Sequence, residues 1–481
     1  MKTQKNTKII GTVSDMRCEP EFIQNLINKG MNVIRLNTAH QNPEGTKKIV
    51  ENARSVSDRI PFILDTKGPE VRTSDIENPL DVEKEEEIII RSNKSSSEES
   101  SGKEKKYFCV NYGRFCEDLG KGDIVLIDDG DIRLRVEEKL ETGLKCIAEN
   151  QGKIKNKKSV NVPGRRVDLP SLSEKDKEYV EFCKENDIDF IAHSFVRSKE
   201  DVFAIKEILR DRAKDIKIMA KIEDQEGIDN LDEILDNVYG VMVARGDLGV
   251  ELPAERIPEI QRYIVKKCIE RKKVVIVATQ MLHTMIKNPR PTRAEVSDVA
   301  NAVYLGADSI MLSGETAYGD YPQEAVKTMS NIAKEIEEHK ESIDESSIKT
   351  MNNEIAAFLA KSAVRSTLNL DIKAIVMDTL TGRTAKHVSA FRGKKPVFAQ
   401  CYNKKVMRQL ALSYGIFPSY KEAKNSPDEF ISDIVVPLVK KREFNNDDLV
   451  TILAGSFGPT HGASFIEISK VKNLINNKNL A

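Results

Sequence analysis

A short, nearly continuous apolar run followed by a helical pattern recurs eight times along this sequence, and this repeat restricts the fold more than any other feature. Runs such as GVMVARGD (240–247) and VVIVATQ (274–280) are typical of strands buried on both faces of a parallel sheet. Eight such units predict an α/β fold of the (β/α)8, or TIM barrel, type. The predicted strands are Lys8–Val13, Met31–Asn37, Phe62–Thr66, Asp189–Phe195, Ile216–Glu223, Gly240–Asp247, Val274–Gln280 and Ser309–Glu315.

The third and fourth predicted strands are separated by far more residues than an ordinary βα loop contains. Part of this stretch reads KGDIVLIDDGDIRLRVEEK (121–139), whose alternation and Asp-Gly turn are typical of antiparallel strands. We therefore expect a small antiparallel β domain at 70–165, inserted into a barrel domain made of 1–69 and 166–340. Within it, SNKSSSEESSGKEKK (92–106) is expected to be a flexible surface loop.

A third region follows the barrel pattern. The polar stretch HKESIDESSIKTMNN (339–353) is expected to be a linker, and strand and helix patterns alternate again after it. The strand candidates are KAIVMD (373–378), PVFAQ (396–400), LVTILAG (449–455) and SFIEISKV (464–471). They predict a C-terminal α/β domain at 350–481. Three domains is also the number that a length of 481 residues favours.

Composition argues against several classes of function. Lys plus Arg is 75 and Asp plus Glu is 76, and this balance disfavours electrostatic binding of nucleic acid. Tryptophan is absent, which disfavours a base-stacking platform. Seven cysteines without a CxxC pair are typical of reduced thiols. Because the sequence has neither a long apolar run nor an apolar signal region, we expect a cytoplasmic protein without a membrane partner.

Several well-known catalytic motifs are missing. The sequence contains no GxxxxGK[ST], no GxGxxG after a strand, no GxSxG and no HExxH. A P-loop, a Rossmann dinucleotide site, a nucleophile elbow and a zincin site are therefore not expected. If the chain uses a nucleotide, barrel loops and the inserted domain must hold it.

Polar residues end one predicted strand after another. The carboxyl ends of barrel strands meet at one mouth, where active sites of this fold are built, so these side chains should converge. For a single residue, the alternative is a polar strand end that merely lies near solvent. The residues are Arg35, Asn37, Asp65, Lys221, Glu223, Asp247, Thr279, Ser313 and Glu315.

The types of these residues suit anionic substrates and a divalent cation. Glu223 and Asp247 offer the hard oxygen ligands that Mg²⁺ prefers. Lys221 lies two residues before Glu223, so both side chains point to one face of the strand. An ammonium beside a metal-binding carboxylate suits a transferring phosphoryl group or an enolate, although a purely structural Lys–Glu pair is the alternative. Arg35 and Arg72 could clamp phosphate.

Motif stretches spread over the whole barrel carry a resemblance to a known family. The stretches are GMNVIRLNTAH (30–40), LDTKGPEVRT (64–73), SVNVPG (159–164), LPSLSEKD (169–176), SFVRSKEDV (194–202), AKIEDQEGIDNLDEI (220–234), VARGDLGVE (243–251), ATQMLHTMIKNPRPTRAEVSDVANAV (278–303) and ADSIMLSGETAYGDYP (307–322). In order and spacing they closely resemble the pyruvate kinase family, and the last two stretches are the most specific. The C-terminal region resembles this family mainly at TLTGRTA.

The resemblance implies a barrel with a small inserted β-barrel lid and a C-terminal α/β domain, assembled as a homotetramer. It implies the final step of glycolysis, which is phosphoryl transfer from phosphoenolpyruvate to ADP to give pyruvate and ATP. By motif position, Arg35 and Lys221 should bind and stabilise the phosphoryl group. The backbone at Gly246 and Asp247 should lie near the substrate carboxylate, and Thr279 near the carbon that is protonated.

The resemblance also implies cofactors and a nucleotide site. Glu223 and Asp247 should hold Mg²⁺ or Mn²⁺, while Arg72 and Lys158 resemble nucleotide contacts. The residues that resemble the family's potassium ligands are Asn37, Asp65 and Thr66. At this site the sequence departs from the pattern, because Ala39 replaces a serine that normally contributes a hydroxyl. Glu70, in contrast, is the residue type that accompanies K⁺ dependence in this family. We therefore expect a weak K⁺ site in an enzyme that still needs a monovalent cation.

The loop after the strand candidate 373–378 has several hydroxyls and a glycine before a helical pattern. Such a loop can bind phosphate at a helix N-terminus, or it can be an ordinary capped turn. In the family it belongs to an allosteric site, so the resemblance implies a sugar-phosphate or nucleotide effector. The loop residues are Thr379, Thr381, Gly382, Arg383 and Thr384.

Two other functions fit part of the sequence. A metal-dependent lyase or aldolase acting through a pyruvate enolate would use a similar mouth, but would not need the inserted domain or Arg72. A barrel that senses metabolites without catalysis is the other alternative. The presence of Lys221, Glu223 and Asp247 together argues against such a loss of catalysis.

Overall fold

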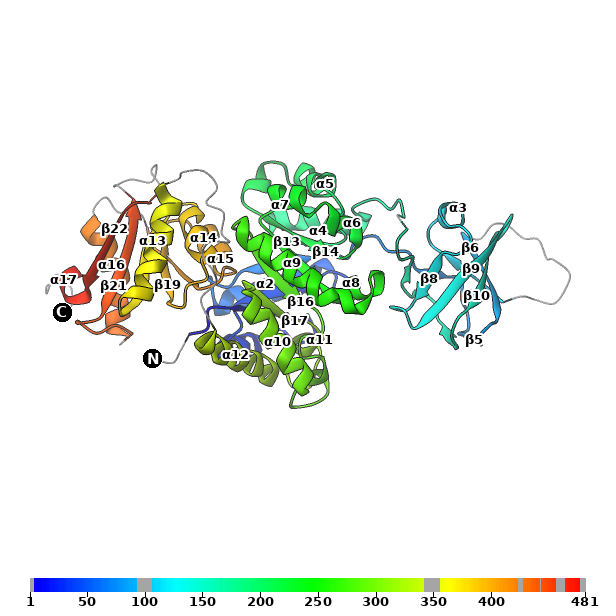
Figure 1. The fold of residues 1–481 in the computed structure, drawn as a ribbon, viewed down its shortest axis with the longest axis horizontal. Helices are drawn as coiled ribbons and strands as arrows, with labels where there is room; N and C mark the ends of the chain where they lie inside the picture. The colour runs from blue at the N-terminus through cyan, green and yellow to red at the C-terminus, as the bar shows by residue number, and fades with distance from the viewer. Residues whose placement is uncertain are drawn as a thin grey trace.

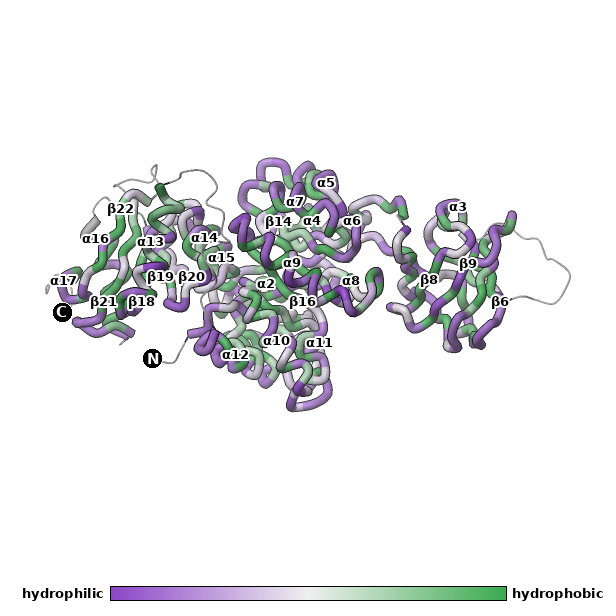
Figure 2. Tube along the Cα trace, in the orientation of Figure 1, coloured by the Kyte–Doolittle hydropathy of each residue, from purple (hydrophilic) through white to green (hydrophobic). Residues whose placement is uncertain are grey.

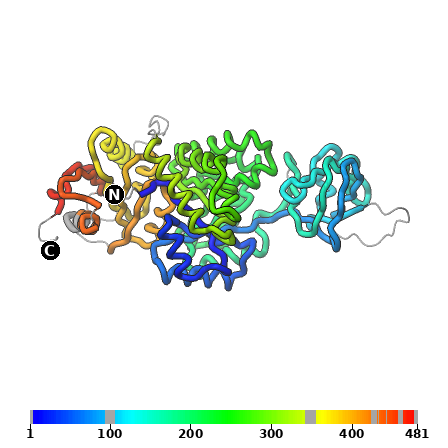
Figure 3. Tube along the Cα trace, turned by 90° about the horizontal axis from the view of Figure 1, so that it is seen from below, coloured from blue at the N-terminus to red at the C-terminus, as the bar shows by residue number. Residues whose placement is uncertain are grey.

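The computed structural model describes residues 4–92, 106–165, 167–340, 355–422, 427–441, 443–455 and 463–475. The predicted surface loop at 92–106 and the predicted linker at 339–353 lie almost entirely outside these residues. Figures 1 and 3 show an elongated molecule, with the inserted sheet at one end, the C-terminal sheet at the other and the barrel between them. No helix in the described part of the chain is long and apolar enough to cross a membrane.

Eight parallel strands close into a barrel, in the order β1-β17-β16-β15-β14-β13-β3-β2. This confirms the predicted barrel and the place of every predicted strand. The strands are β1 (Lys8–Thr12), β2 (Val33–Asn37), β3 (Phe62–Asp65), β13 (Phe190–His193), β14 (Lys217–Ile222), β15 (Gly240–Ala244), β16 (Val274–Ala278) and β17 (Ser309–Leu312).

Seven of the eight barrel strands end earlier than the sequence predicts, by two or three residues at β13, β15, β16 and β17. β15 ends at Ala244, because the chain turns there into helix α8 (Arg245–Glu251), so Asp247 lies in a helix. β16 ends at Ala278, because Thr279 and Gln280 have φ angles of 66° and 52°, which a strand does not adopt. β17 ends at Leu312, and a short helix, α11 (Gly314–Ala317), follows.

Helices cover the outside of the barrel, and side-chain caps fix where some of them begin. Ser173 and Asp176 form a capping box at α4, and Thr292 and Glu295 form another at α10. The covering helices are α1 (Pro20–Lys29), α2 (Pro43–Val56), α4 (Glu174–Glu185), α5 (Lys199–Leu209), α6 (Gln225–Asp229), α7 (Leu231–Asn237), α9 (Ile257–Glu270), α10 (Arg293–Leu305) and α12 (Pro322–His339).

The barrel has an inner and an outer apolar core. The inner core includes Ile10, Phe190 and Met242, and Leu412 from the C-terminal region joins it. Leu412 therefore contributes to the core at the amino ends of the barrel strands. There its carbonyl accepts a hydrogen bond from the hydroxyl of Ser309, the first residue of β17 (3.0 Å). Figure 2 shows hydrophobic residues along the strands and hydrophilic residues along much of the outer helical surface.

The insertion forms a seven-stranded sheet, in the order β12-β8-β9-β10-β6-β7-β4, beside the β11–β5 pair. Most of its strand pairs are antiparallel, as predicted, but β6 and β7 are parallel, so the sheet is mixed. The segment 93–106 joins these two strands and is long enough for the chain to return in the same direction. The elements are β4 (Thr73–Ser74), β5 (Leu80–Val82), β6 (Glu87–Ser92), β7 (Tyr107–Val110), α3 (Phe115–Asp118), β8 (Ile124–Ile127), β9 (Ile132–Leu140), β10 (Gly143–Ala148), β11 (Gly152–Ile154) and β12 (Val160–Asn161).

The C-terminal region is an α/β unit whose sheet order is β20-β19-β18-β21-β22. Only the edge strand β22 is antiparallel to its neighbour. The elements are α13 (Ile355–Asn369), β18 (Ile372–Thr379), α14 (Arg383–Ala390), β19 (Val397–Cys401), α15 (Lys404–Leu410), β20 (Ile416–Tyr420), α16 (Pro427–Lys440), β21 (Leu449–Gly455), β22 (Ala463–Lys470) and α17 (Val471–Leu474).

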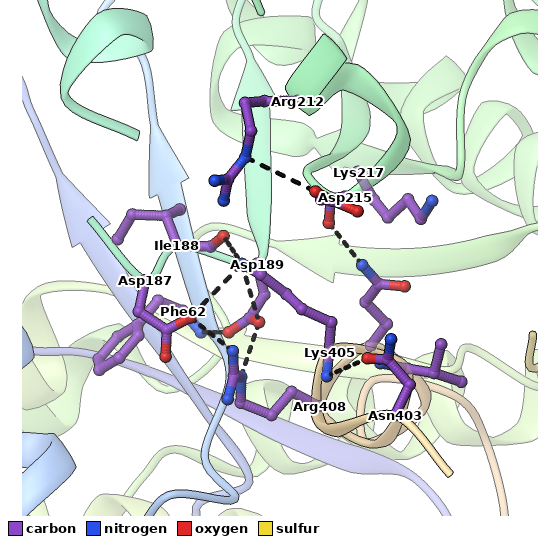
Figure 4. Close-up of polar contacts among 12 residues, drawn as sticks. Phe62, Asp187, Ile188, Asp189, Arg212, Asp215, Lys217, Asn403, Lys405 and Arg408 are labelled. Carbon is purple, nitrogen blue, oxygen red and sulfur yellow. Dashed lines mark hydrogen bonds and ion pairs between the residues drawn. The ribbon is translucent and has the colours of Figure 1, made fainter. Parts of the chain in front are cut away.

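The C-terminal unit contacts the barrel at the amino ends of its strands, which we call the N-terminal face. Arg408 on α15 forms ion pairs with Asp189 (Nε to Oδ1, 2.7 Å) and Asp187 (Nη2 to Oδ1, 2.6 Å), and Figure 4 shows this network. On another side of this face, Arg392 pairs with Asp308 at 2.6 Å. The site predicted at the carboxyl ends of the strands therefore lies at the opposite end of the barrel.

Candidate active site at the barrel mouth

Lys221 lies at the centre of the charged groups at the mouth. It is on β14, and its ammonium lies 2.9 Å from Glu223 Oε1 and 3.2 Å from Asp65 Oδ1. It also donates a hydrogen bond to the Ser194 hydroxyl (2.7 Å). Burial acts to lower the pKa of Lys221, but the carboxylates of Asp65, Glu223 and Asp247 together raise it above its ordinary value. Lys221 therefore holds a full positive charge in a buried position.

Arg35 extends this cluster from β2, the strand next to the β3 strand that carries Asp65. Its Nε donates to Asp65 Oδ2 (2.6 Å), and its Nη1 donates to the Thr12 hydroxyl (3.1 Å). Asp65 is 1% exposed and is shared between Arg35 and Lys221. Burial acts to raise the pKa of Asp65, but these two cations lower it, so Asp65 remains ionised. The carboxylate thus holds two cations from different strands in fixed positions.

Glu223 and Asp247 are the two carboxylates proposed to bind metal. Glu223 is 2% exposed, and its Oε2 accepts a hydrogen bond from the Phe195 backbone N–H (2.6 Å). Burial raises the pKa of Glu223, Lys221 opposes this, and the charge of Asp247 adds to it. Burial also raises the pKa of Asp247. Glu223 is buried and Asp247 half-buried, and the charge of Asp247 disfavours that of Glu223. A dication would stabilise both carboxylates, so the residues present fit a Mg²⁺ ion.

The described residues supply only part of a metal coordination shell. Nowhere among them do three or more Asp, Glu, His or Cys side chains gather as a metal-binding group. This agrees with Mg²⁺ chemistry, because Mg²⁺ usually takes one or two carboxylates and completes its shell with water and substrate oxygens.

Thr279 and Gly246 connect the ends of β15 and β16. The Thr279 hydroxyl accepts a hydrogen bond from the Gly246 backbone N–H (2.8 Å) and donates one to the Ala278 carbonyl (2.7 Å). Its hydrogen is therefore already engaged. The left-handed φ of Thr279 is held by Arg245, whose guanidinium donates to the Thr279 carbonyl (2.6 Å) and pairs with Asp298 (2.5 Å).

Most of the predicted strand-end residues do converge, but Glu315 does not join the charged cluster. Its buried carboxylate accepts hydrogen bonds from the backbone N–H groups of Leu282 (3.2 Å) and Ser313 (2.7 Å). Glu315 thus stabilises loops beside the mouth. Asn37 lies at the end of β2, where its side-chain oxygen accepts a hydrogen bond from the Ala39 N–H (3.3 Å).

Arg72 and Lys158 lie together where the inserted sheet joins the barrel. Arg72 forms an isolated antiparallel β-bridge with Ser159, and its side-chain Nη1 donates to the Lys157 carbonyl (2.6 Å). Arg72 also pairs with Glu70, and Lys158 pairs with Asp128 (2.8 Å). Both cations are about one-third exposed, so their charged ends remain accessible.

The predicted phosphate loop is a turn between β18 and α14. The Thr379 hydroxyl accepts a hydrogen bond from the Gly382 N–H (2.9 Å), and Gly382 has a φ of 81°, a conformation that favours glycine. Thr381 and Arg383 are exposed, whereas Thr384 is buried.

Sequence reasoning did not select Ser194 or Arg245 as site residues. Ser194 accepts from Lys221 and donates to the Thr66 carbonyl (2.6 Å), so it holds the ammonium against the end of β3. Both residues lie inside motif stretches quoted above, which was the available signal. Their roles depend on contacts between different strands, and residue type alone does not reveal these.

Comparison with known proteins gives a consistent result. A family model described as "Pyruvate kinase, barrel domain" matches residues 4–326, and one described as "Pyruvate kinase, alpha/beta domain" matches residues 358–469. A pyruvate kinase of Borreliella burgdorferi is 45% identical over 481 residues, which cover 99% of this chain and 99% of that protein. A pyruvate kinase of Staphylococcus epidermidis is 42% identical over 461 residues, which cover 94% of this chain and 78% of that protein.

Proposed function

Because this chain belongs to the pyruvate kinase family, we propose that it transfers the phosphoryl group of phosphoenolpyruvate to ADP, giving pyruvate and ATP in the final step of glycolysis. The observation that carries this proposal is the position of Lys221. A buried ammonium among the carboxylates of Asp65, Glu223 and Asp247, with Arg35 beside it, suits a substrate that brings both phosphate and carboxylate charge.

Arg35 and Lys221 would act on the phosphoryl group and on the enolate left after its transfer. Arg35 can offer N–H groups to phosphate oxygens, and Asp65 fixes the direction of its side chain. Lys221 would offset the negative charge that grows on the enolate oxygen as the phosphorus–oxygen bond breaks. Ser194 and Asp65 already hold the ammonium in place, so little reorganisation is needed during the reaction.

Glu223 and Asp247 would hold the Mg²⁺ or Mn²⁺ ion, together with substrate oxygens and water. When bound, the ion would supply positive charge next to the phosphoryl and enolate oxygens. The Gly246 N–H donates to the Thr279 hydroxyl, which orders the α8 backbone near the place proposed for the substrate carboxylate.

The enolate must take up a proton at carbon to become pyruvate. The hydrogen of the Thr279 hydroxyl is engaged by the Ala278 carbonyl, and a threonine hydroxyl is a poor acid. We therefore propose that Thr279 orders a water chain that delivers the proton, with Ser313 on the neighbouring strand end as a second contact. Thr279 is then a positioning residue for the proton donor.

ADP would bind where the inserted sheet meets the barrel, with Arg72 and Lys158 as contacts to its phosphates. Their partial exposure and the single acidic partner of each support this role. The insertion would then act as a lid over the mouth. The domain division that goes with this proposal is 1–69 and 166–340 for the barrel, 70–165 for the lid and 350–481 for the C-terminal domain.

A K⁺ ion is proposed beside Asn37, Asp65 and Thr66. Asp65 Oδ1 is buried and accepts no aligned hydrogen bond, although Lys221 lies 3.2 Å away, so it offers an oxygen to a cation. Ala39 has no hydroxyl to contribute, which fits weak binding. Assays in buffers without sodium, potassium or ammonium ions should show reduced turnover.

The remaining proposals rest mainly on the family. They are a cytoplasmic location, a homotetramer, and an allosteric effector that carries a phosphate, either a sugar phosphate or a nucleotide. Thr379, Thr381, Gly382, Arg383 and Thr384 would form the effector loop. The exposed hydroxyl of Thr381 beside the exposed Arg383 supports phosphate binding there.

One assay tests the main proposal. Purified protein is mixed with phosphoenolpyruvate, ADP and Mg²⁺, and pyruvate is followed through a coupling enzyme. Pyruvate formation that requires ADP supports the kinase. Pyruvate released equally well without ADP would favour the lyase alternative, and absence of turnover would favour a sensor.

A further inference from the structure

The turn that follows β13 is strained at Phe195. Its φ angle is 53°, in the left-handed region that a bulky side chain such as phenylalanine rarely adopts. A conformation of this kind persists only where the surroundings enforce it, and such residues cluster at functional sites. Phe195 directly follows Ser194, whose hydroxyl accepts a hydrogen bond from Lys221, so the strained residue adjoins the charged cluster at the mouth.

The backbone N–H of Phe195 is directed at one of the carboxylates proposed to bind metal. This N–H donates to Glu223 Oε2 at 2.6 Å, while Glu223 Oε1 pairs with the Lys221 ammonium at 2.9 Å. Each oxygen of the carboxylate is therefore held by a different neighbour. Two such contacts fix the orientation of the Glu223 carboxylate as well as its position.

Hydrogen bonds anchor both neighbours of Phe195. The Ser194 N–H donates to the Thr66 hydroxyl (3.0 Å), and the Ser194 hydroxyl donates to the Thr66 carbonyl (2.6 Å). On the other side, the Val196 N–H donates to the Lys221 carbonyl (3.3 Å). Because both sides are anchored, a negative φ at Phe195 would require the peptide group between Ser194 and Phe195 to rotate. Its N–H would then turn away from Glu223, so the left-handed conformation and this hydrogen bond depend on each other.

The Phe195 ring lies against Gly68, at the base of the insertion. Gly68 has a φ of 74°, and a Cβ atom placed on it would lie 2.6 Å from Phe195 Cδ2 and 2.9 Å from Ser194 Cβ. A glycine therefore leaves the space that the ring occupies. The backbone N–H groups of Lys67 and Gly68 donate to the buried Asp176 carboxylate (2.9 and 3.4 Å), which holds this support in place.

We propose that Phe195 is a positioning residue for the metal site, because its left-handed turn, supported by Gly68, holds the Glu223 carboxylate in the orientation that binds the divalent cation. Groups behind a metal ligand commonly orient it and raise metal affinity in this way. Since Gly68 lies just before the insertion, the same contact connects the insertion to the metal site. This inference rests on the proposed function, which assigns Glu223 to the cation.

Two substitutions that remove the same ring but differ in backbone preference test the proposal. Asparagine tolerates a positive φ, whereas β-branched valine does not. Mn²⁺ binding to the full chain without substrate is measured from the electron paramagnetic resonance signal of free Mn²⁺. We expect Phe195→Val to weaken binding at least about tenfold and Phe195→Asn less than about threefold. Equal losses in both variants would overturn the proposal, because loss of ring packing alone would affect them alike.

A second variant covers the case in which Phe195→Val disturbs folding. Phenyllactic acid in place of Phe195, introduced by nonsense suppression, keeps the ring and replaces only the N–H by an ester oxygen. We expect this chain to bind Mn²⁺ about tenfold more weakly while its circular dichroism spectrum is unchanged. Unweakened binding would overturn the proposal. Phe203→Val, on the exposed side of α5, is the matched control and should bind Mn²⁺ as the unmodified chain does.

A double-mutant cycle tests the support from Gly68. The methyl group of Gly68→Ala would displace the Phe195 ring, so this variant should bind Mn²⁺ about fivefold more weakly than the unmodified chain. In the Phe195→Asn background, where the ring is absent, the same change should cost less than about twofold. Losses of equal size in both backgrounds would overturn the role of the ring contact.

Glu223→Gln separates failure of this inference from failure of the proposed function. This variant should weaken Mn²⁺ binding more than any variant at Phe195. Unchanged binding in Glu223→Gln would overturn the assignment of the metal site and this inference with it. Weakened binding in Glu223→Gln, together with normal binding in Phe195→Val, would overturn the inference alone.

Discussion

Lys221 and Lys386 are both largely buried lysines, one at each end of the barrel, yet their surroundings shift their pKa values in opposite directions. At the mouth, Asp65, Glu223 and Asp247 raise the pKa of Lys221 against the effect of burial. At the N-terminal face, burial and Lys273 lower the pKa of Lys386 to about 8. Burial alone therefore does not decide the charge of a lysine, and the supply of counter-charge does.

The N-terminal face itself contains both kinds of cation, those with an acidic partner and one without. Arg392 and Arg408 each have a buried acidic partner, Asp308 and Asp189 respectively. Lys386 has none among the described residues. Ion pairs of this kind hold the C-terminal unit and the barrel together, whereas Lys386 adds no such pair. The following predictions test that division, from the largest expected effect to the smallest.

The largest expected effect is the loss of stability on removing Asp308, the buried partner of Arg392 at the N-terminal face. Asp308→Ala leaves the Arg392 guanidinium buried without its partner, and we expect a loss of about 3–5 kcal/mol in stability. Urea unfolding followed by circular dichroism measures this change. The matched control is Asp371→Ala, because Asp371 is fully exposed and its ion pair with Lys395 is long, at 4.0 Å. That control should change stability by less than about 0.5 kcal/mol. Equal losses in both variants would contradict the role of the buried pair.

Removing the matched lysine at the mouth should affect turnover. For Lys221→Ala we expect kcat to fall at least about a hundredfold, which corresponds to about 2.7 kcal/mol, with a modest change in KM. The physical reason is the loss of the charge that offsets the enolate. Steady-state kinetics with phosphoenolpyruvate and ADP measures it, and Lys217→Ala, at the other end of the same strand, serves as control. A near-normal kcat in Lys221→Ala would refute the assignment.

Removing Lys386 should increase stability, whereas removing Asp308 should decrease it. Lys386→Met keeps an apolar stem of similar length but removes the uncompensated charge. We expect a gain of about 0.5–2 kcal/mol in stability at neutral pH. Urea unfolding at neutral pH tests this. Destabilisation relative to the unmodified chain would show that the charge of Lys386 is compensated.

The smallest expected effect is the change with pH in the stability difference between the unmodified chain and Lys386→Met. In the folded chain Lys386 releases its proton near pH 8, whereas an unfolded lysine does so near 10.4. Between these values the unfolded state binds more protons, so stability rises with pH. The charged Lys386 therefore lowers the free energy of unfolding by its full amount below pH 8. This loss of stability disappears as pH rises toward about 10.4. The difference between the unmodified chain and Lys386→Met should shrink across that window, and a constant difference would contradict the lowered pKa.

Sequence reasoning predicted the features that repeat locally. Eight apolar runs were enough for the barrel, because strands buried on both faces leave a strong pattern. The convergence of Arg35, Asp65 and Lys221 followed from the rule that strand ends meet at one mouth. It missed contacts that distant segments create together, such as the hydrogen bond between Lys221 and Ser194. The parallel pairing of β6 and β7 was missed because hydrophobic alternation does not encode the partner of a strand.

The insertion between β3 and β13 has a consequence for how the barrel forms. These strands pair side by side in the closed barrel, although residues 66–189 separate them in the chain. Loop-closure entropy grows only with the logarithm of length, so this detour disfavours closure by about 1–2 kcal/mol more than a βαβ crossover of about 25 residues does. Because the inserted sheet has its own apolar core, it can collapse before the strands meet and shorten that loop further. Closure of the barrel is therefore expected to be a late step in folding, after the insertion has formed.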